Sequence, residues 1–125
     1  MKLLNHEFVG STIHYYFENG IELVVEDWGS GTKWWYQNGK HHRLDGPAIE
    51  YSNGDKFWFQ NGKRHRLDGP ACEWSNDSKE WYQNDKLHRL DGPAIEWADG
   101  HKYWYIEGKH YSEQDFNQMV KNRPA

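Results

Sequence analysis

The 125-residue sequence predicts a mainly β fold, an elongated antiparallel sheet of β-hairpin repeats that ends in a short C-terminal helix. The first observation behind this prediction is the string His-Arg-Leu-Asp-Gly-Pro-Ala. It occurs at residues 42–48, 65–71 and 88–94 and sets a period of 23 residues. The second is a pair of turn signals in each unit, and the third is the short aromatic segments between those turns, which have high β propensity.

The repeats organise the whole chain. We expect a single repeat domain over residues 1–125, because this is the length of one ordinary domain. Each full unit starts at its leading aromatic residue, which gives units at residues 28–50, 51–73 and 74–96. A degenerate copy precedes them at residues 1–27, a partial copy follows at 97–111, and a capping helix is predicted at 112–122.

Turn residues define two hairpin turns and one bend within a unit. In the middle copy, Asn53-Gly54 and Asn61-Gly62 are both predicted to form type I′ turns, since both residues of such a pair tolerate positive φ. The β-prone segment 56–60 lies between them. The tripeptide at residues 68–70 predicts a bend in which glycine supplies unusual dihedral angles, and a second strand begins at its proline.

Tryptophan marks one face of the predicted strands. Side chains alternate along a strand, so Trp58 lies on one face while Phe57 and Phe59 lie on the other. The Trp58 position is tryptophan in every copy and the Phe57 position varies, so we expect the first to be packed and the second wetter. The tryptophans assigned this structural role are Trp35, Trp58, Trp81 and Trp104.

The C-terminal segment predicts a short amphipathic helix. Ser112 followed three residues later by an acid has the form of an N-cap, and Phe116, Met119 and Val120 have helical spacing. Pro124 marks the end of the helix. Because the open end of a repeat array exposes apolar surface, we interpret the helix as a lid on the array, with docking of a partner as the alternative.

The composition indicates a folded protein. Aliphatic residues are scarce, but the net charge is only −4, and 8 Trp and 8 Tyr supply the apolar area of a core. No apolar run approaches the roughly 20 residues of a membrane span, so we expect a soluble, cytoplasmic protein without a membrane partner. The pI near 6.0 disfavours nucleic acid as a partner.

Cysteine and the remaining polar residues offer no catalytic arrangement. Cys72 is the single cysteine and stands where Ile49 and Ile95 stand in other copies, so we interpret it as a small core residue. Equivalent histidines in successive repeats would lie roughly 10 Å apart, too far to share a metal ion. No phosphate-binding loop or nucleophile elbow is present. The sequence therefore predicts no enzyme, no metal and no cofactor.

The repeated polar residues are given structural roles, because an enzyme builds one asymmetric site and not three identical ones. Each aspartate of the string is predicted to cap its own turn or to pair with the neighbouring arginine. The glutamates Glu50, Glu73 and Glu96 are predicted to face solvent. The structural residues of the string are His42, His65, His88, Arg43, Arg66, Arg89, Asp45, Asp68 and Asp91.

Aromatic residues are more numerous than one thin sheet can bury, which indicates an interaction surface. The candidate binding stripe consists of Trp34, Phe57 and Tyr103 with the lysines that precede this position, Lys33, Lys56, Lys79 and Lys102. The alternative is a second buried layer, formed where the ends fold over the sheet or where two copies dimerise.

The repeat motif resembles that of small proteins encoded by bacteriophages. The elements that carry the resemblance are Gly-Pro-Ala-x-Glu-Trp, Lys-x-Trp-Tyr, Asn-Gly-Lys and His-Arg-x-Asp, over residues 28 to about 111. The unit is also loosely similar to MORN repeats in length and hairpin layout, although Pro-Ala departs from their glycine-rich pattern. The phage resemblance implies a small protein that acts on the host, for example against its defences.

Three functions remain open from the sequence. The first is a non-enzymatic protein that binds a host defence or regulatory protein and blocks it sterically. The second is a sponge that sequesters a nucleotide or another small ligand by aromatic stacking, in a pocket that a homodimer could form. The third is a structural or virion-associated protein.

Overall fold

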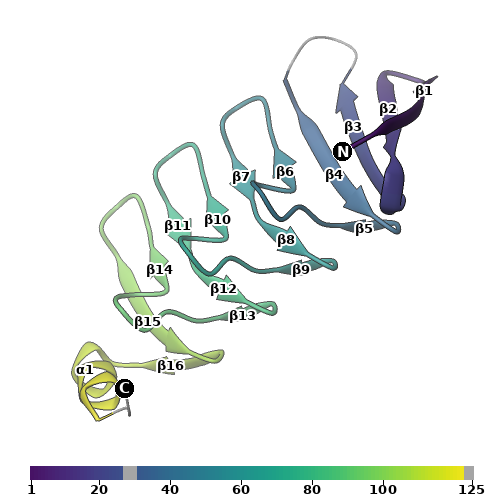
Figure 1. The fold of residues 1–125 in the computed structure, drawn as a ribbon. Helices are drawn as coiled ribbons and strands as arrows, with labels where there is room; N and C mark the ends of the chain where they lie inside the picture. The colour runs from purple at the N-terminus through teal and green to yellow at the C-terminus, as the bar shows by residue number, and fades with distance from the viewer. Residues whose placement is uncertain (27–30, 123–125) are drawn as a thin grey trace. The chain divides into compact units, whose positions relative to one another are not determined.

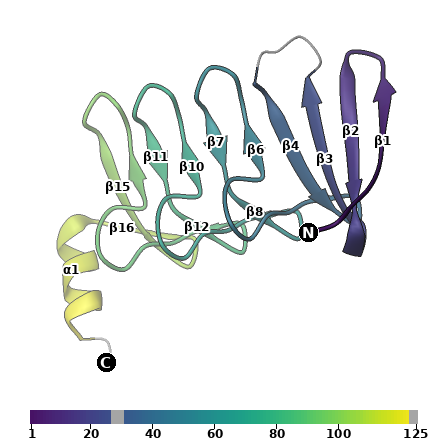
Figure 2. The ribbon, with the colours of Figure 1, turned by 45° about the horizontal axis from the view of Figure 1, so that its top comes forward.

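The computed structural model describes residues 1–26 and 31–122. Within them the chain is mainly β, with antiparallel hairpins and one C-terminal helix (Figures 1 and 2), which confirms the predicted fold class. The backbone groups into two compact units, Met1–Lys63 and Arg64–Ala125, which we describe separately. Trp28, the predicted start of the first full repeat, and Pro124 lie outside the described residues.

The first unit is built on long N-terminal hairpins followed by shorter repeat strands. Strands β1 to β4 pair antiparallel in chain order, β4 also pairs with β5 and β6, and β6 pairs with β7. A 3-10 turn at Glu18–Gly20 joins β2 to β3. The strands are β1 Leu3–Val9, β2 Thr12–Phe17, β3 Ile21–Glu26, β4 Lys33–Gln37, β5 Lys40–His41, β6 Ile49–Glu50, β7 Lys56–Phe57 and β8 Phe59–Gln60.

The second unit repeats the short-strand pattern and adds the helix. Strands β10, β11, β14, β15 and β16 pair antiparallel in this order, and β12 pairs with β13. Strand β9, Lys63–Arg64, lies where the two units join. The other elements are β10 Cys72–Glu73, β11 Lys79–Glu80, β12 Tyr82–Gln83, β13 Lys86–Leu87, β14 Ile95–Glu96, β15 Lys102–Ile106, β16 Lys109–Tyr111 and α1 Glu113–Lys121.

The two turns of a unit differ in conformation. Asn61 and Gly62 both have positive φ, 52° and 79°, as a type I′ turn requires. The same prediction for Asn53-Gly54 is wrong, because of this pair only Gly54 has positive φ, 100°. There the Asn53 side chain accepts a hydrogen bond from the Asp55 N–H at 2.9 Å, so the asparagine caps the turn instead of adopting the left-handed conformation.

In the bend before each Pro-Ala, the role of the glycine differs from the predicted one. Gly46, Gly69 and Gly92 do not have positive φ. A Cβ on Gly92 would lie 2.9 Å from Cζ of Arg89, and the other two glycines have the same geometry with their own arginines. Glycine is required because the guanidinium packs against its Cα, and the prediction of unusual dihedral angles is therefore wrong.

Small residues form the centre of the packing. Ala48, Ala71 and Ala94 have no exposed surface, and the next position along the chain, Ile49, Cys72 or Ile95, is also buried. Alanine at the buried centre lets the backbones of neighbouring strands approach closely. The core is consequently narrow, and the large aromatic side chains surround it.

The C-terminal helix covers the last strands of the second unit. Ser112 caps it by accepting a hydrogen bond from the Asp115 N–H at 3.1 Å, as predicted. The helix packs against β15 and β16 (Figure 2), and its Phe116 is buried. This packing supports the interpretation of the helix as a lid.

Candidate functional site

The repeat arginine is the centre of a polar and aromatic cluster in each full repeat. Arg89 Nε donates to Asp91 at 2.8 Å, and its Nη1 donates to the Pro93 carbonyl at 3.0 Å. Its guanidinium lies 3.8 Å from the centre of the Trp81 ring. Arg43 and Arg66 make the same bonds to Asp45 and Asp68, both at 3.0 Å, so the predicted arginine–aspartate pairing is confirmed.

The repeated glutamates belong to the same cluster, which corrects their predicted exposure to solvent. Glu50, Glu73 and Glu96 are half-buried, and each carboxylate lies near Nη1 of its repeat's arginine. The three N–O distances are 3.5, 3.2 and 3.6 Å. A carboxylate at this position therefore neutralises a half-buried guanidinium, which is a structural role.

The repeat histidines link one repeat to the next. The Asn61 N–H donates to Nδ1 of His42 at 2.9 Å, and the Asn84 N–H donates to Nδ1 of His65 at 3.1 Å. The bond to His88 comes from the next turn along the chain and measures 2.9 Å. Because Nδ1 is the acceptor, the proton of the neutral ring is on Nε2. These bonds support the structural role predicted for the three histidines.

The lysines of the predicted stripe lie on the opposite face from its aromatic residues. Trp34 and Phe57 both pair with Ile49 across the strands and are half-buried, whereas Lys33 and Lys56 both pair with Glu50. In the second unit Tyr103 pairs with Ile95, and Lys79 and Lys102 pair with glutamates. Alternation along the strand separates the two sets, so the lysines form a charge ladder with the glutamates.

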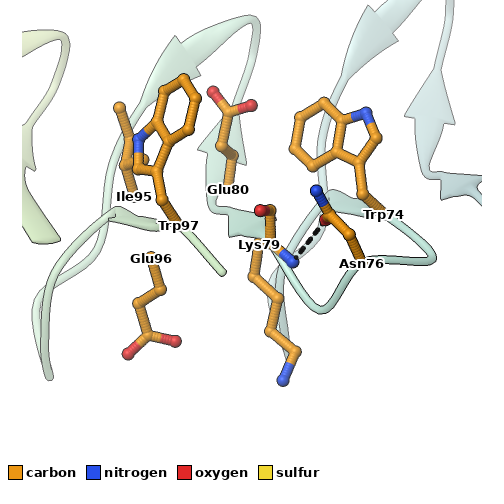
Figure 3. Close-up of a pocket in the computed structure, with 8 residues that line it drawn as sticks. Trp74, Asn76, Lys79, Glu80, Ile95, Glu96 and Trp97 are labelled. Atoms are coloured by element: carbon orange, nitrogen blue, oxygen red, sulfur yellow. Dashed lines mark hydrogen bonds between the residues drawn. The ribbon is translucent and has the colours of Figure 1, made fainter. Parts of the chain in front are cut away.

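A hollow in the second unit lies between two tryptophans that each lead a repeat. Trp74 and Trp97 flank a cleft of about 280 Å³, and Glu80 and Ile95 line it between them. Figure 3 shows the Glu80 carboxylate between the two indoles, with Lys79 pointing away. Trp97 is 53% exposed, so one wall of the cleft is open to a ligand.

Hydrogen bonds within the turns position Trp74 and Trp97, the two walls of the cleft. Asn76 Oδ1 accepts from the Ser78 N–H at 3.0 Å (Figure 3), which closes the turn after Trp74. Ser78 Oγ in turn accepts from the Ala98 N–H at 2.9 Å, next to Trp97. The cleft is therefore formed by two repeats that are bonded to each other.

Glu80 is a half-buried acid without a basic partner. Its carboxylate accepts one hydrogen bond, from the Tyr82 hydroxyl at 3.1 Å. No Lys, Arg or His nitrogen of the described residues lies within 4.0 Å of it. Burial, reinforced by the negative charge of Glu80, raises the pKa of Tyr82 to about 12. The nearby Arg64 is already paired with Asp85 at 2.9 Å.

A hydrogen-bonded chain in the first unit has the residue types of a catalytic triad. His14 Nδ1 lies 2.6 Å from a Glu22 oxygen, and its Nε2 lies 3.0 Å from Thr12 Oγ1. The Thr12 hydroxyl, however, donates its proton to the Val9 carbonyl at 2.8 Å. The Val9 carbonyl therefore competes with the imidazole for the one hydroxyl proton, and the arrangement does not by itself mark the threonine as an activated nucleophile.

Cys72 is confirmed as a buried core residue, and its environment yields a pH prediction. Burial, with a smaller contribution from Glu80, raises the pKa of the thiol from 9.0 to about 12. The folded thiol keeps its proton to higher pH than the unfolded one, so the free energy of unfolding falls as pH rises above about 9. The slope for this group approaches about 1.4 kcal/mol per pH unit once the unfolded thiol is fully ionised, and the loss between about pH 8 and pH 10 totals about 1.4 kcal/mol.

Urea unfolding between about pH 8 and pH 10 measures this slope. Cys72→Ile, which installs the residue of the other repeats, should remove it over that range. The raised pKa of Tyr82 adds its own loss only above pH 10.0, its ordinary value. Equal slopes for the wild type and Cys72→Ile would contradict the prediction.

Sequence reasoning missed both Glu80 as a lone acid and the pairing of Trp74 with Trp97. The sequence signal that could have revealed Glu80 is the replacement of an aromatic residue by glutamate in one repeat only.

None of the described helices has the length and apolar character needed to cross a membrane, and the described residues contain no group of three metal-ligating side chains. Comparison with protein-family models, with curated proteins and with solved structures gives no match.

Proposed function

We propose that this chain is a non-enzymatic protein-binding module that acts by occupying a surface of its partner. The observation that carries the proposal is the exposure of aromatic side chains on the hairpin faces of both units. Tyr51 is 41% exposed, Trp97 53% and Tyr103 39%. Exposed aromatic residues are enriched at the centres of protein interfaces, where they supply most of the binding energy.

In the first unit a hollow of about 490 Å³ lies beside Trp34 and Tyr36, but it is shallow and open, so it would enclose little of a nucleotide. The cleft between Trp74 and Trp97 is more enclosed, but its size favours a protein side chain over a nucleotide. Its volume of about 280 Å³ is just below the range of small-molecule sites, which measure about 300 to 1,000 Å³. A single side chain or a group of similar size fits this volume. The resemblance to phage-encoded repeat proteins supports a host defence or regulatory protein as the partner, which steric occlusion would inhibit.

Affinity capture from a bacterial lysate tests the proposal. The bait variants are Trp97→Ser and Tyr103→Ser, with Leu67→Ser as the matched control, because Leu67 is 75% exposed at a different repeat position. The captured protein is identified by mass spectrometry, purified and titrated by calorimetry. We expect the wild type and Leu67→Ser to bind it equally, and the two aromatic variants to bind at least about tenfold more weakly.

Two outcomes would contradict the proposal. Equal binding by all four proteins would show that Trp97 and Tyr103 do not contribute to the interface. If no protein binds the wild type at stoichiometric level, the module has no protein partner in that lysate, and the function as proposed is wrong.

A further inference from the structure

Glu80 stands at a position that an aromatic ring occupies in the other repeats, and it leaves a gap there. The equivalent residues are Trp34, Phe57 and Tyr103. In the first unit, Tyr51 packs edge-on against Trp34 and Phe57, with ring centroids 6.3 and 5.9 Å away. In the second unit, the glutamate replaces such a ring between Trp74 and Trp97, and the cleft occupies the space.

The charge of Glu80 is not compensated within the described chain. The other half-buried glutamates of this unit, Glu73 and Glu96, each lie next to a repeat arginine. Glu80 has only a neutral hydroxyl as a hydrogen-bond partner. A carboxylate held between apolar rings loses hydration, and a cation placed beside it recovers part of that loss.

The indole rings of Trp74 and Trp97 also favour a cationic ligand. The face of an indole carries negative potential and attracts ammonium and guanidinium groups placed within about 6 Å of the ring centre. The protein already uses this interaction, because Arg89 lies 3.8 Å from the Trp81 ring centre and Arg64 lies 4.1 Å from that of Tyr82. A cleft flanked by two indoles, with an acid between them, is suited to a cation from outside the chain.

We propose that the cleft between Trp74 and Trp97 binds one cationic side chain, the ammonium or guanidinium end of a lysine or arginine of the partner protein, with Glu80 as its counter-ion. The identity of the partner as a protein rests on the proposed function, whereas the affinity of the cleft for a cation does not. The volume of about 280 Å³ admits the end of one such side chain.

A titration with choline tests the cation site directly. The probe is compared with its uncharged isostere, in which carbon replaces the nitrogen, and the indole N–H resonances of Trp74 and Trp97 are followed by NMR. We expect saturable shifts with choline at a dissociation constant of about 1 to 10 mM and no saturable shift with the isostere. Glu80→Gln should weaken choline binding by about tenfold or more.

Two further variants keep the test interpretable. Glu96→Gln is the matched control, because Glu96 also lines the cleft but lies next to Arg89, and it should bind choline like the wild type. Glu80→Phe, which installs the residue found at position 57, should fill the cleft and abolish choline binding while the amide spectrum remains that of a folded protein.

The outcomes separate the two proposals. Equal choline binding by the wild type and Glu80→Gln, or binding of the neutral isostere as tight as that of choline, would overturn the cation site even if a partner is captured. Choline binding that depends on Glu80, without any captured protein, would support the cation site and reject the proposed function. A captured partner that binds Glu80→Gln as tightly as the wild type would overturn the assignment of its side chain to the cleft.

Discussion

Replacement of Arg89 by alanine is expected to lower the free energy of unfolding by about 3 kcal/mol, a large share of the roughly 5 to 15 kcal/mol typical of a domain. The side chain of Arg89 is only 21% exposed and lies next to the acids Asp91 and Glu96. Its removal leaves the half-buried carboxylate of Glu96 without a counter-charge. It also deprives the Pro93 carbonyl of its donor and opens space between Gly92 and the Trp81 ring.

The individual contacts of Arg89 differ in importance. Asp91 is 86% exposed, so its ion pair with Arg89 resembles a surface salt bridge, which contributes at most about 1 kcal/mol. The hydrogen bond to the Pro93 carbonyl and the stacking on Trp81 are shielded from water and are stronger. Arg89→Lys keeps the charge but loses the planar fork, and we expect it to cost about 2 kcal/mol.

Urea unfolding followed by circular dichroism measures these differences. Asp91→Ala is the control, and we expect it to cost less than about 1 kcal/mol. Since repeat proteins can unfold locally, hydrogen exchange of the Trp81 and His88 amides, which bond to Ala94 and Trp81, should accelerate in Arg89→Ala. If Asp91→Ala destabilises the protein as much as Arg89→Ala does, the exposed ion pair is the main contribution and the argument from burial is wrong.

The mainly β fold follows from the sequence because the repeat makes its local signals unambiguous. Three copies of one string fix the period, and Asn61-Gly62 identifies a turn whose backbone conformation few other residue pairs adopt. The N-cap of Ser112 is equally local, since its hydrogen bond spans three residues. In these two cases the local structure is the one that the short pattern favours, so the sequence alone predicts it.

The errors arise where a residue is selected by a contact that the sequence does not display. Gly92 is typical of a residue with unusual dihedral angles, but it is required by the guanidinium of Arg89. Asn53 has the sequence of a type I′ turn, yet its side chain bonds to the backbone instead. Glu50 has the polarity of an exposed strand residue but lies beside a half-buried arginine.

The candidate site was predictable only in part. An excess of aromatic residues indicates an interaction surface, but the sequence does not show which of them are exposed. Variability between the repeats favours Trp34 and Phe57, whereas Trp97 is more exposed than either. The importance of Glu80 depends on the absence of a basic nitrogen within 4.0 Å among the described residues, and on the pairing of the nearby Arg64 with Asp85, which the sequence does not display.

The packing of the repeat alanines leads to the second large effect. We expect Ala48→Leu to lower the free energy of unfolding by about 3 kcal/mol, because overfilled cores distort side chains and backbone. Ala48 has no exposed surface. Its N–H donates to the Phe57 carbonyl at 2.8 Å, and its carbonyl accepts from the Trp35 N–H at 2.7 Å. The backbone is held on both sides, so it cannot move to admit a larger side chain without breaking one of these bonds.

Thermal unfolding provides the measurement. A loss of about 3 kcal/mol corresponds to a fall in Tm of about 10 °C for a chain of this length. Leu44→Ala is the control, because Leu44 is 76% exposed in the same repeat, and it should leave Tm within about 2 °C of the wild type. A tolerated leucine at position 48 would mean that the repeats can separate to accommodate it. A close approach of backbones would then not be the reason for the alanine, and the narrow core would be a consequence of the aromatic packing around it.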